Sequence, residues 1–167
     1  MRVQGRVWKF GDSVDTDVIY PSRYLVTFDP AEVATHVMEG IDPQFVKRLA
    51  QGDLIVAGEN FGCGSAREQA AMALKYAGVG AILADSFSRT FFRNAINLAL
   101  PVLPLKGISR AVEAGQHLEA DLRSGRIHNR TTGQTLQAQP LPEFILQMLE
   151  KGGAIPYYKS TYLKQEG

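Results

Sequence analysis

The stretch DLIVAGENFGCGSAREQAAMALKYAGVGAILAD, residues 53–85, predicts the fold class of this chain. An apolar strand at 53–58 leads into a glycine-rich loop, and helical spacing of apolar residues then runs from Ser65 to a stop at Gly78. A second apolar strand follows at 79–85. Apolar strands separated by a helix indicate an α/β fold with a parallel sheet covered by helices.

The same alternation continues on both sides of this stretch. Two short helices with an Asp-Pro start and a Gly stop are expected, and Asp29, Pro30 and Glu32 form the capping box of the first. The expected strands are 2–12 and 101–105, and the expected helices are 29–40, 42–52, 88–100 and 141–153.

Three segments depart from the alternation. Residues 116–139 place two glycine-containing turns between polar alternating runs, which predicts an antiparallel β-meander in a second small sheet or barrel wall. Residues 12–30 are interpreted as a long ordered loop, and residues 157–167 as a tail. Long loops in compact domains are usually functional, so 12–30 is a candidate for the site.

Composition limits the function classes. The chain has 167 residues, which suits one domain spanning 1–167, and its 45% hydrophobic content is ordinary for a globular protein. A net charge of +1 without a basic stripe favours neither nucleic acid nor an anionic membrane. Short apolar runs and an N-terminus unlike a signal peptide predict a cytoplasmic protein. One Cys and three scattered His are too few for a zinc or iron–sulfur site, so we expect no metal in this chain.

The loop GCGSAREQ, residues 62–69, invites several kinds of chemistry. A strand–glycine loop–helix junction suits anions, but the lysine of a phosphate loop and the third glycine of a dinucleotide fingerprint are missing. Cys63 has no histidine nearby in sequence, so a small buried side chain is preferred over a nucleophile.

Ser65 and Arg67 leave two interpretations open. Ser65 and Glu68 have the spacing of a capping box, which needs no ligand. Arg67 opposes the helix dipole at a cost of about 0.3 to 1 kcal/mol, which favours an anionic ligand held by its guanidinium. The loop is therefore either structural or a carboxylate-binding site.

Three motifs in order resemble the aconitase superfamily: DTDVIYPSRYL (15–25), GENFGCGSAREQAA (58–71) and GAILADSFSRTFFRNAINLALPVLPL (80–105). The resemblance covers nearly the whole chain. Length and order are similar to the separate small subunits of isopropylmalate isomerase (3-isopropylmalate dehydratase) and homoaconitase. It implies a swivelling β/β/α domain that closes over a [4Fe-4S] cluster.

The resemblance implies roles for individual residues. Ser65 matches the base that removes a proton from the substrate carbon, Arg67 the arginine that binds a substrate carboxylate, and Asp17 the aspartate that supports the acid/base network. Two positions depart from the pattern. Ala66 replaces a second serine, so backbone N–H groups of the Gly64–Ala66 segment replace its hydroxyl, and Gln69 replaces a histidine.

The resemblance also implies a cofactor and a partner outside this chain. The cluster is expected on three cysteines of a large subunit, and the substrate is a small di- or tricarboxylate. Val26 matches the position that faces the variable substituent of the substrate, and Thr27 beside it tolerates either kind of substituent through its methyl and hydroxyl groups. YLVT in place of YLRT favours the branched apolar group of isopropylmalate, hence leucine biosynthesis.

Alternatives remain at this stage. The chain could serve homoaconitase or another hydro-lyase of substituted malates or maleates, or it could be a stand-alone carboxylate-binding regulatory domain. Val26 could simply pack its loop onto the domain. Arg89 and Arg93 are possible ligands, but solvated or salt-bridged helix arginines are the preferred interpretation, and His36 is interpreted as a packed or surface residue.

Overall fold

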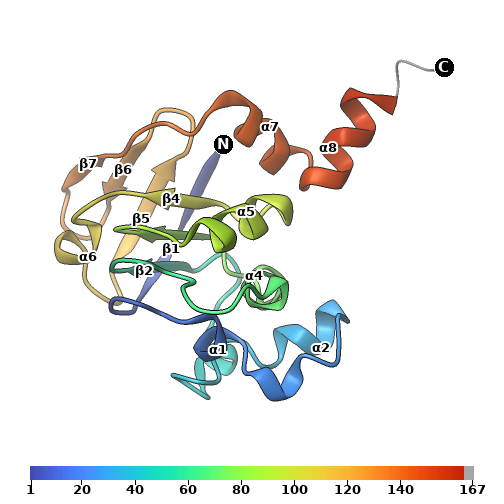
Figure 1. Cartoon of the computed structure of the whole chain (residues 1–167). Coiled ribbons are helices and arrows are strands. Elements are labelled where there is room, and N and C mark those ends of the chain that lie inside the picture. The colour runs from blue at the N-terminus through green and yellow to red at the C-terminus, as the bar shows by residue number, and fades with distance from the viewer. Residues whose placement is uncertain (164–167) are drawn as a thin grey trace.

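The computed structural model describes residues 1–163 and contains one seven-stranded mixed sheet in the order β4-β3-β2-β1-β5-β6-β7 (Figure 1). Four strands run parallel: β1 (Arg2–Lys9), β2 (Leu54–Ala57), β3 (Ala81–Ala84) and β4 (Val102–Pro104). The others continue the sheet antiparallel: β5 (His117–Asp121), β6 (Arg126–Asn129) and β7 (Thr135–Gln137). The predicted α/β class, parallel sheet and meander are confirmed.

The meander is not a second sheet, and this part of the prediction is wrong. β1 pairs with β5 through residues 2–6 and with β2 through residues 7–9. Because its two ends serve different neighbours, a single strand joins the parallel and antiparallel halves. Sequence patterns predict where strands occur, but they do not predict which strands pair with one another.

The core explains why the central stretch folds as predicted. Every residue of β2 and β3 is buried, as expected for parallel strands that are covered on both faces. Helix α4 (Glu68–Ala77) buries a run of residues that is rich in alanine, and it packs against α2 and α5. Gly78 ends α4 in the left-handed conformation, with φ of 106°.

The predicted helices are correctly placed but begin or end differently. They are α2 (Pro30–Ala34), α3 (Phe45–Arg48), α5 (Arg89–Asn97) and α7 (Glu143–Glu150). The capping box at Asp29 is wrong, because the Asp29 side chain makes no capping bond and the Glu32 carboxylate accepts from Thr27 Oγ1 at 3.1 Å. Ser88 does cap α5, accepting from the Phe91 N–H.

Other helices were not predicted. Segment 12–30 contains α1 (Thr16–Ile19) and the 3-10 turn η1 (Ser22–Tyr24), and α6 (Ile108–Ala111) follows β4. The expected tail forms α8 (Ala154–Thr161), which extends away from the sheet (Figure 1), and its residues 164–167 lie outside the described part. Within 1–163, no helix is long and apolar enough to cross a membrane.

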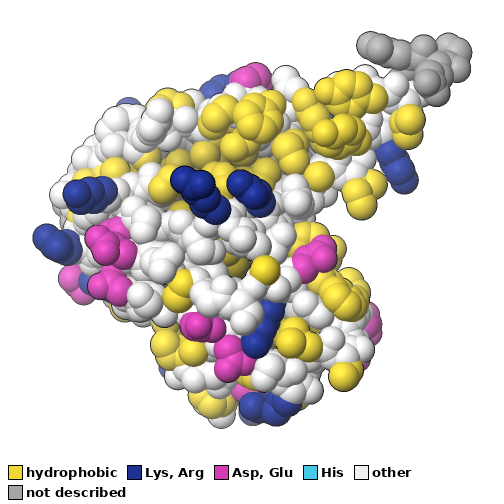
Figure 2. Space-filling model, viewed as in Figure 1, with side chains coloured by type: hydrophobic (Ala, Val, Ile, Leu, Met, Phe, Trp, Pro, Cys, Tyr) yellow, Lys and Arg dark blue, Asp and Glu magenta, His cyan; other side chains and the backbone are white. Residues whose placement is uncertain are grey.

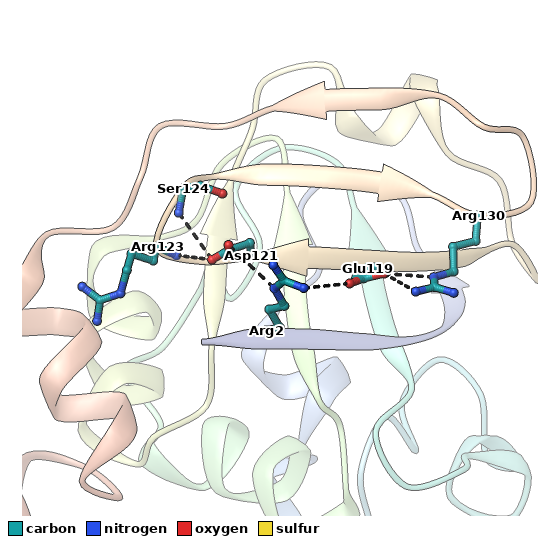
Figure 3. A network of polar contacts seen from close by, with 6 residues as sticks. All are labelled: Arg2, Glu119, Asp121, Arg123, Ser124 and Arg130. Atoms are coloured by element: carbon teal, nitrogen blue, oxygen red, sulfur yellow. Dashed lines mark hydrogen bonds and ion pairs between the residues drawn. The ribbon is translucent and has the colours of Figure 1, made fainter.

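The outer face of the antiparallel half carries a network of charged side chains, with exposed arginines and partly buried carboxylates (Figure 3). Arg2 lies 3.8 Å from Glu119 and 3.9 Å from Asp121, and Glu119 also pairs with Arg130. Surface ion pairs of this kind contribute about 0 to 1 kcal/mol each. We interpret this face as solvated scaffold.

Candidate active site

The glycine loop, residues 58–67, lies at the carboxyl end of β2 between two other segments. On one side, the Ser88 hydroxyl donates to the Gly62 carbonyl oxygen at 2.8 Å. On the other side, the Thr16 N–H donates to the Cys63 carbonyl oxygen at 2.9 Å. Loops at the carboxyl ends of parallel strands are where α/β proteins bind ligands, so the fold places this loop at a ligand-binding edge.

Two glycines are required in the loop for steric reasons. Gly62 has φ of 80°, and a Cβ added there would lie 2.2 Å from the Phe91 ring. Gly64 has φ of 87°, and a Cβ there would lie 2.4 Å from Asp15 Oδ2. Their function is close packing in a left-handed backbone, as positions without a Cβ allow.

Ser65 is exposed and does not cap a helix. Helix α4 begins at Glu68, with Arg67 as its N-cap residue in an extended conformation, so the capping-box interpretation of Ser65 is wrong. The Ser65 carbonyl oxygen accepts from Thr16 Oγ1 at 2.7 Å, which fixes the backbone. Within residues 1–163 we find no hydrogen bond of the Ser65 hydroxyl, so this exposed group is available to a ligand.

Arg67 and Asp17 form an ion pair beside Ser65. Arg67 Nη1 lies 2.7 Å from Asp17 Oδ1 and donates to the Tyr20 carbonyl oxygen at 3.3 Å. The Arg67 hydrogen bond, followed by the Ser22 N–H, holds the pKa of the Asp17 carboxyl below its ordinary value. Asp17 is therefore ionised at neutral pH and orients the guanidinium, whose side chain is only 15% exposed.

The loop lines a small cavity of about 80 Å³. Its walls come from the glycine loop and the start of α5: Thr16, Gly62, Gly64, Ser65, Ala66, Arg67, Ser88, Arg89, Thr90, Phe91 and Asn94. Complete small-molecule pockets measure roughly 300 to 1,000 Å³, so this cavity can hold a carboxylate but not enclose a whole substrate. By its volume, this cavity is only part of a substrate-binding site.

Val26 and Thr27 do not line this cavity. Val26 is 93% exposed, so the interpretation that it packs its loop onto the domain is wrong. Thr27 donates its hydroxyl to Glu32, and the preceding Leu25 carbonyl oxygen accepts from Gln69 Nε2 at 3.5 Å. The residues on both sides of Val26 are thus held by hydrogen bonds, whereas the Val26 side chain is exposed to solvent.

Sequence reasoning missed the residues that hold the Val26 loop. Tyr24 stacks on His36 with ring centroids 3.5 Å apart, and its hydroxyl donates to Glu39 at 2.7 Å. His36 Nδ1 lies 2.8 Å from Glu39, so this histidine is a packed residue, as interpreted. Tyr24 lies within the motif DTDVIYPSRYL, but nothing in the sequence pointed to Glu39.

The residues of this chain do not fit an iron–sulfur cluster. Cys63 is the only cysteine and is a half-buried free thiol. Among residues 1–163, no group of three or more His, Cys, Asp and Glu side chains could hold a metal ion. A cluster of the kind that the resemblance implies needs about three thiolates or more, and this chain has one cysteine.

Comparison with known proteins gives consistent matches. The model of the aconitase C-terminal domain matches residues 31–109. The chain is 54% identical to the isopropylmalate/citramalate isomerase small subunit of Methanocaldococcus jannaschii, covering 98% of both chains. It is 53% identical to the methanogen homoaconitase small subunit of Methanothermobacter thermautotrophicus, covering 95% of this chain and 92% of that one. A crystal structure of a 3-isopropylmalate dehydratase from M. jannaschii superposes with a TM-score of 0.93 at 44% identity, covering 99% of this chain and 98% of that one.

Proposed function

This chain belongs to the 3-isopropylmalate dehydratase small-subunit family of the aconitase superfamily, and on that premise we propose that Ser65 is its catalytic base. It is a subunit of a hydro-lyase that interconverts 2-isopropylmalate and 3-isopropylmalate by dehydration and rehydration in leucine biosynthesis. The observation that carries the assignment of residues is the cavity of about 80 Å³ that brings the Ser65 hydroxyl and Arg67 together.

The chemistry of Ser65 depends on its neighbours. A serine hydroxyl is a weak base, and a nearby guanidinium favours its ionised form because opposite charges attract. Arg67 supplies that charge and can also bind a substrate carboxylate, with the backbone N–H groups of Gly64 and Ala66 as further donors. Asp17 keeps the guanidinium oriented through the 2.7 Å bond. In this proposal Ser65 removes the proton from the carbon next to the bound carboxylate.

A cavity too small for the whole substrate implies that a partner subunit supplies the rest of the site. We propose that the whole chain, residues 1–167, acts as a swivelling domain that closes over a large subunit in the cytoplasm. Because the residues of this chain do not fit the [4Fe-4S] cluster of the superfamily, we assign the cluster to that large subunit. Closure would complete the walls of the cavity and exclude water, which strengthens the electrostatic contacts of Arg67.

The surroundings of Val26 support an isopropyl substituent. An isopropyl group buried against Val26 gains roughly 1.5 to 3 kcal/mol, whereas an unpaired carboxylate there loses several kcal/mol of hydration. The Thr27 hydroxyl is engaged by the Glu32 carboxylate, so Thr27 offers its methyl group and Glu32 repels a distal carboxylate. Both features disfavour homoaconitate, the substrate of the alternative enzyme, although relatives with either name are about equally similar.

The test is a comparison of substrates with the two subunits reconstituted. We expect a higher kcat/KM for 3-isopropylmalate than for homoaconitate, and reversal of this preference in Val26→Arg. Gln139→Arg, which adds the same charge at an exposed position after β7, is the control and should change nothing. A wild-type preference for homoaconitate would assign the chain to the alternative enzyme. Turnover of none of the acids would favour a stand-alone carboxylate-binding regulatory domain.

A further inference from the structure

Arg89 lines the same cavity as Ser65 and Arg67 but has no role in the mechanism above. It is exposed, and it also lines an adjacent hollow of about 330 Å³ that includes Phe92 and Arg93. Within residues 1–163 its guanidinium has no ion pair or hydrogen bond, unlike Arg67. Figure 2 shows basic side chains over α5 and apolar side chains over α7 and α8 on this face.

The charged side chains beside the cavity carry an excess of negative charge that the guanidinium of Arg89 can offset. Asp17 already neutralises Arg67 at 2.7 Å. A second carboxylate, that of Asp15, lies against Gly64, where an added Cβ would be 2.4 Å from its oxygen. Of the two carboxylates beside the glycine loop, only that of Asp17 is paired with a guanidinium within the described residues, and the remaining negative charge of Asp15 would repel an anionic substrate. Arg89 restores the balance at the cavity wall.

Helix stability does not explain an arginine at this position. Arg89 is the first residue of α5, where unpaired N–H groups favour acidic side chains. Ser88 already caps the helix by accepting from the Phe91 N–H at 3.2 Å. Arg93 lies one helical turn further on and lines only the outer hollow. From the sequence alone, Arg89 and Arg93 have the same interpretation, but the fold places only Arg89 at the cavity.

We propose that Arg89 is a second carboxylate-binding residue of this site, which holds a carboxylate of the substrate from the α5 side while Arg67 holds it from the glycine loop. The proposal rests on the proposed function, because it takes the ligand to be a dicarboxylate bound between the two subunits. Guanidinium groups bind carboxylates with two parallel hydrogen bonds, so replacement by an uncharged amide removes charge and geometry together.

The experiment compares Arg89→Gln with Arg93→Gln in the reconstituted complex. Calorimetric titration with 2-isopropylmalate should give a Kd raised about 10- to 100-fold by Arg89→Gln. The Kd should stay within about twofold in Arg93→Gln. The KM should rise in parallel with the Kd of the first variant. The affinity between the subunits, measured separately, should be the same for both variants.

Two results would overturn the proposal. One is an unchanged Kd for 2-isopropylmalate in Arg89→Gln. The other is a loss of subunit affinity with normal dicarboxylate binding once the complex is saturated, which would make Arg89 a contact to the large subunit. Failure of the proposed function looks different. The wild-type complex would then bind the dicarboxylate through Arg89 without converting it.

Discussion

Replacing Gly64 by alanine should damage both stability and activity, by an amount that the structure allows us to calculate. A non-glycine residue at φ of 87° costs about 1 to 2 kcal/mol. The new Cβ would lie 2.4 Å from Asp15 Oδ2, so the Asp15 carboxylate must move. Asp15 caps α1 by accepting from the Asp17 N–H at 2.7 Å, and loss of such a cap costs about 1 kcal/mol. We expect a total of about 2 to 3 kcal/mol.

Gly133→Ala is the matched control. Gly133 has φ of 82°, but an added Cβ meets no atom within 4 Å, so only the backbone cost applies. Urea unfolding should show Gly64→Ala less stable than this control by about 1 kcal/mol. In the reconstituted enzyme, only Gly64→Ala should lower kcat/KM, because displacement of Asp15 disturbs Asp17 and Arg67. Equal unfolding free energies with unchanged kcat/KM in both variants would refute this reasoning.

Three other predictions concern the same site and its supports. Arg67→Lys keeps the charge but loses the planar guanidinium, whose several N–H groups can bind Asp17 and the substrate at the same time. The kcat/KM should therefore fall by about 100-fold or more. An unchanged value would mean that the arginine does not bind substrate. The hydrogen bond from Tyr24 lowers the pKa of Glu39, although burial opposes this effect. At about pH 7 the unfolding free energy of the wild type should therefore be higher than that of Glu39→Gln. This difference should shrink as the pH falls through the lowered pKa, and a difference independent of pH between about 7 and 3 would contradict it. The chain purified alone under anaerobic conditions with iron and sulfide should show neither a cluster absorption band nor turnover, and either signal would contradict the assignment of the cluster to a partner.

Long, periodic elements were the part of the fold that the sequence could predict. The buried strands β2 and β3 and the helix between them follow from apolar patterning and from Gly78. The four-residue helix α1 is too short for periodicity and depends on the Asp15 cap. Helix α8 buries no residue, so it lacks the apolar face against the core that identifies a helix in sequence.

The site was predictable only in part for a similar reason. Arg67 could be singled out because a cation at a helix start has a local electrostatic cost. The role of Ser65 was ambiguous, because a capping box and a loop serine share one sequence pattern, and the start of α4 at Glu68 decides against capping. The contacts of Asp15 and Thr16 with the loop join residues about 50 positions apart in sequence, which no local pattern reveals.

The central claim is that Ser65 is a catalytic base and not a structural serine. The most direct measurement is turnover of 3-isopropylmalate by the reconstituted enzyme carrying Ser65→Ala, with unfolding and subunit association measured alongside. Because the Ser65 hydroxyl has no partner within the described residues, we expect folding and association as in wild type and turnover reduced by about 1,000-fold or more. Near-normal turnover in the alanine variant would contradict the claim.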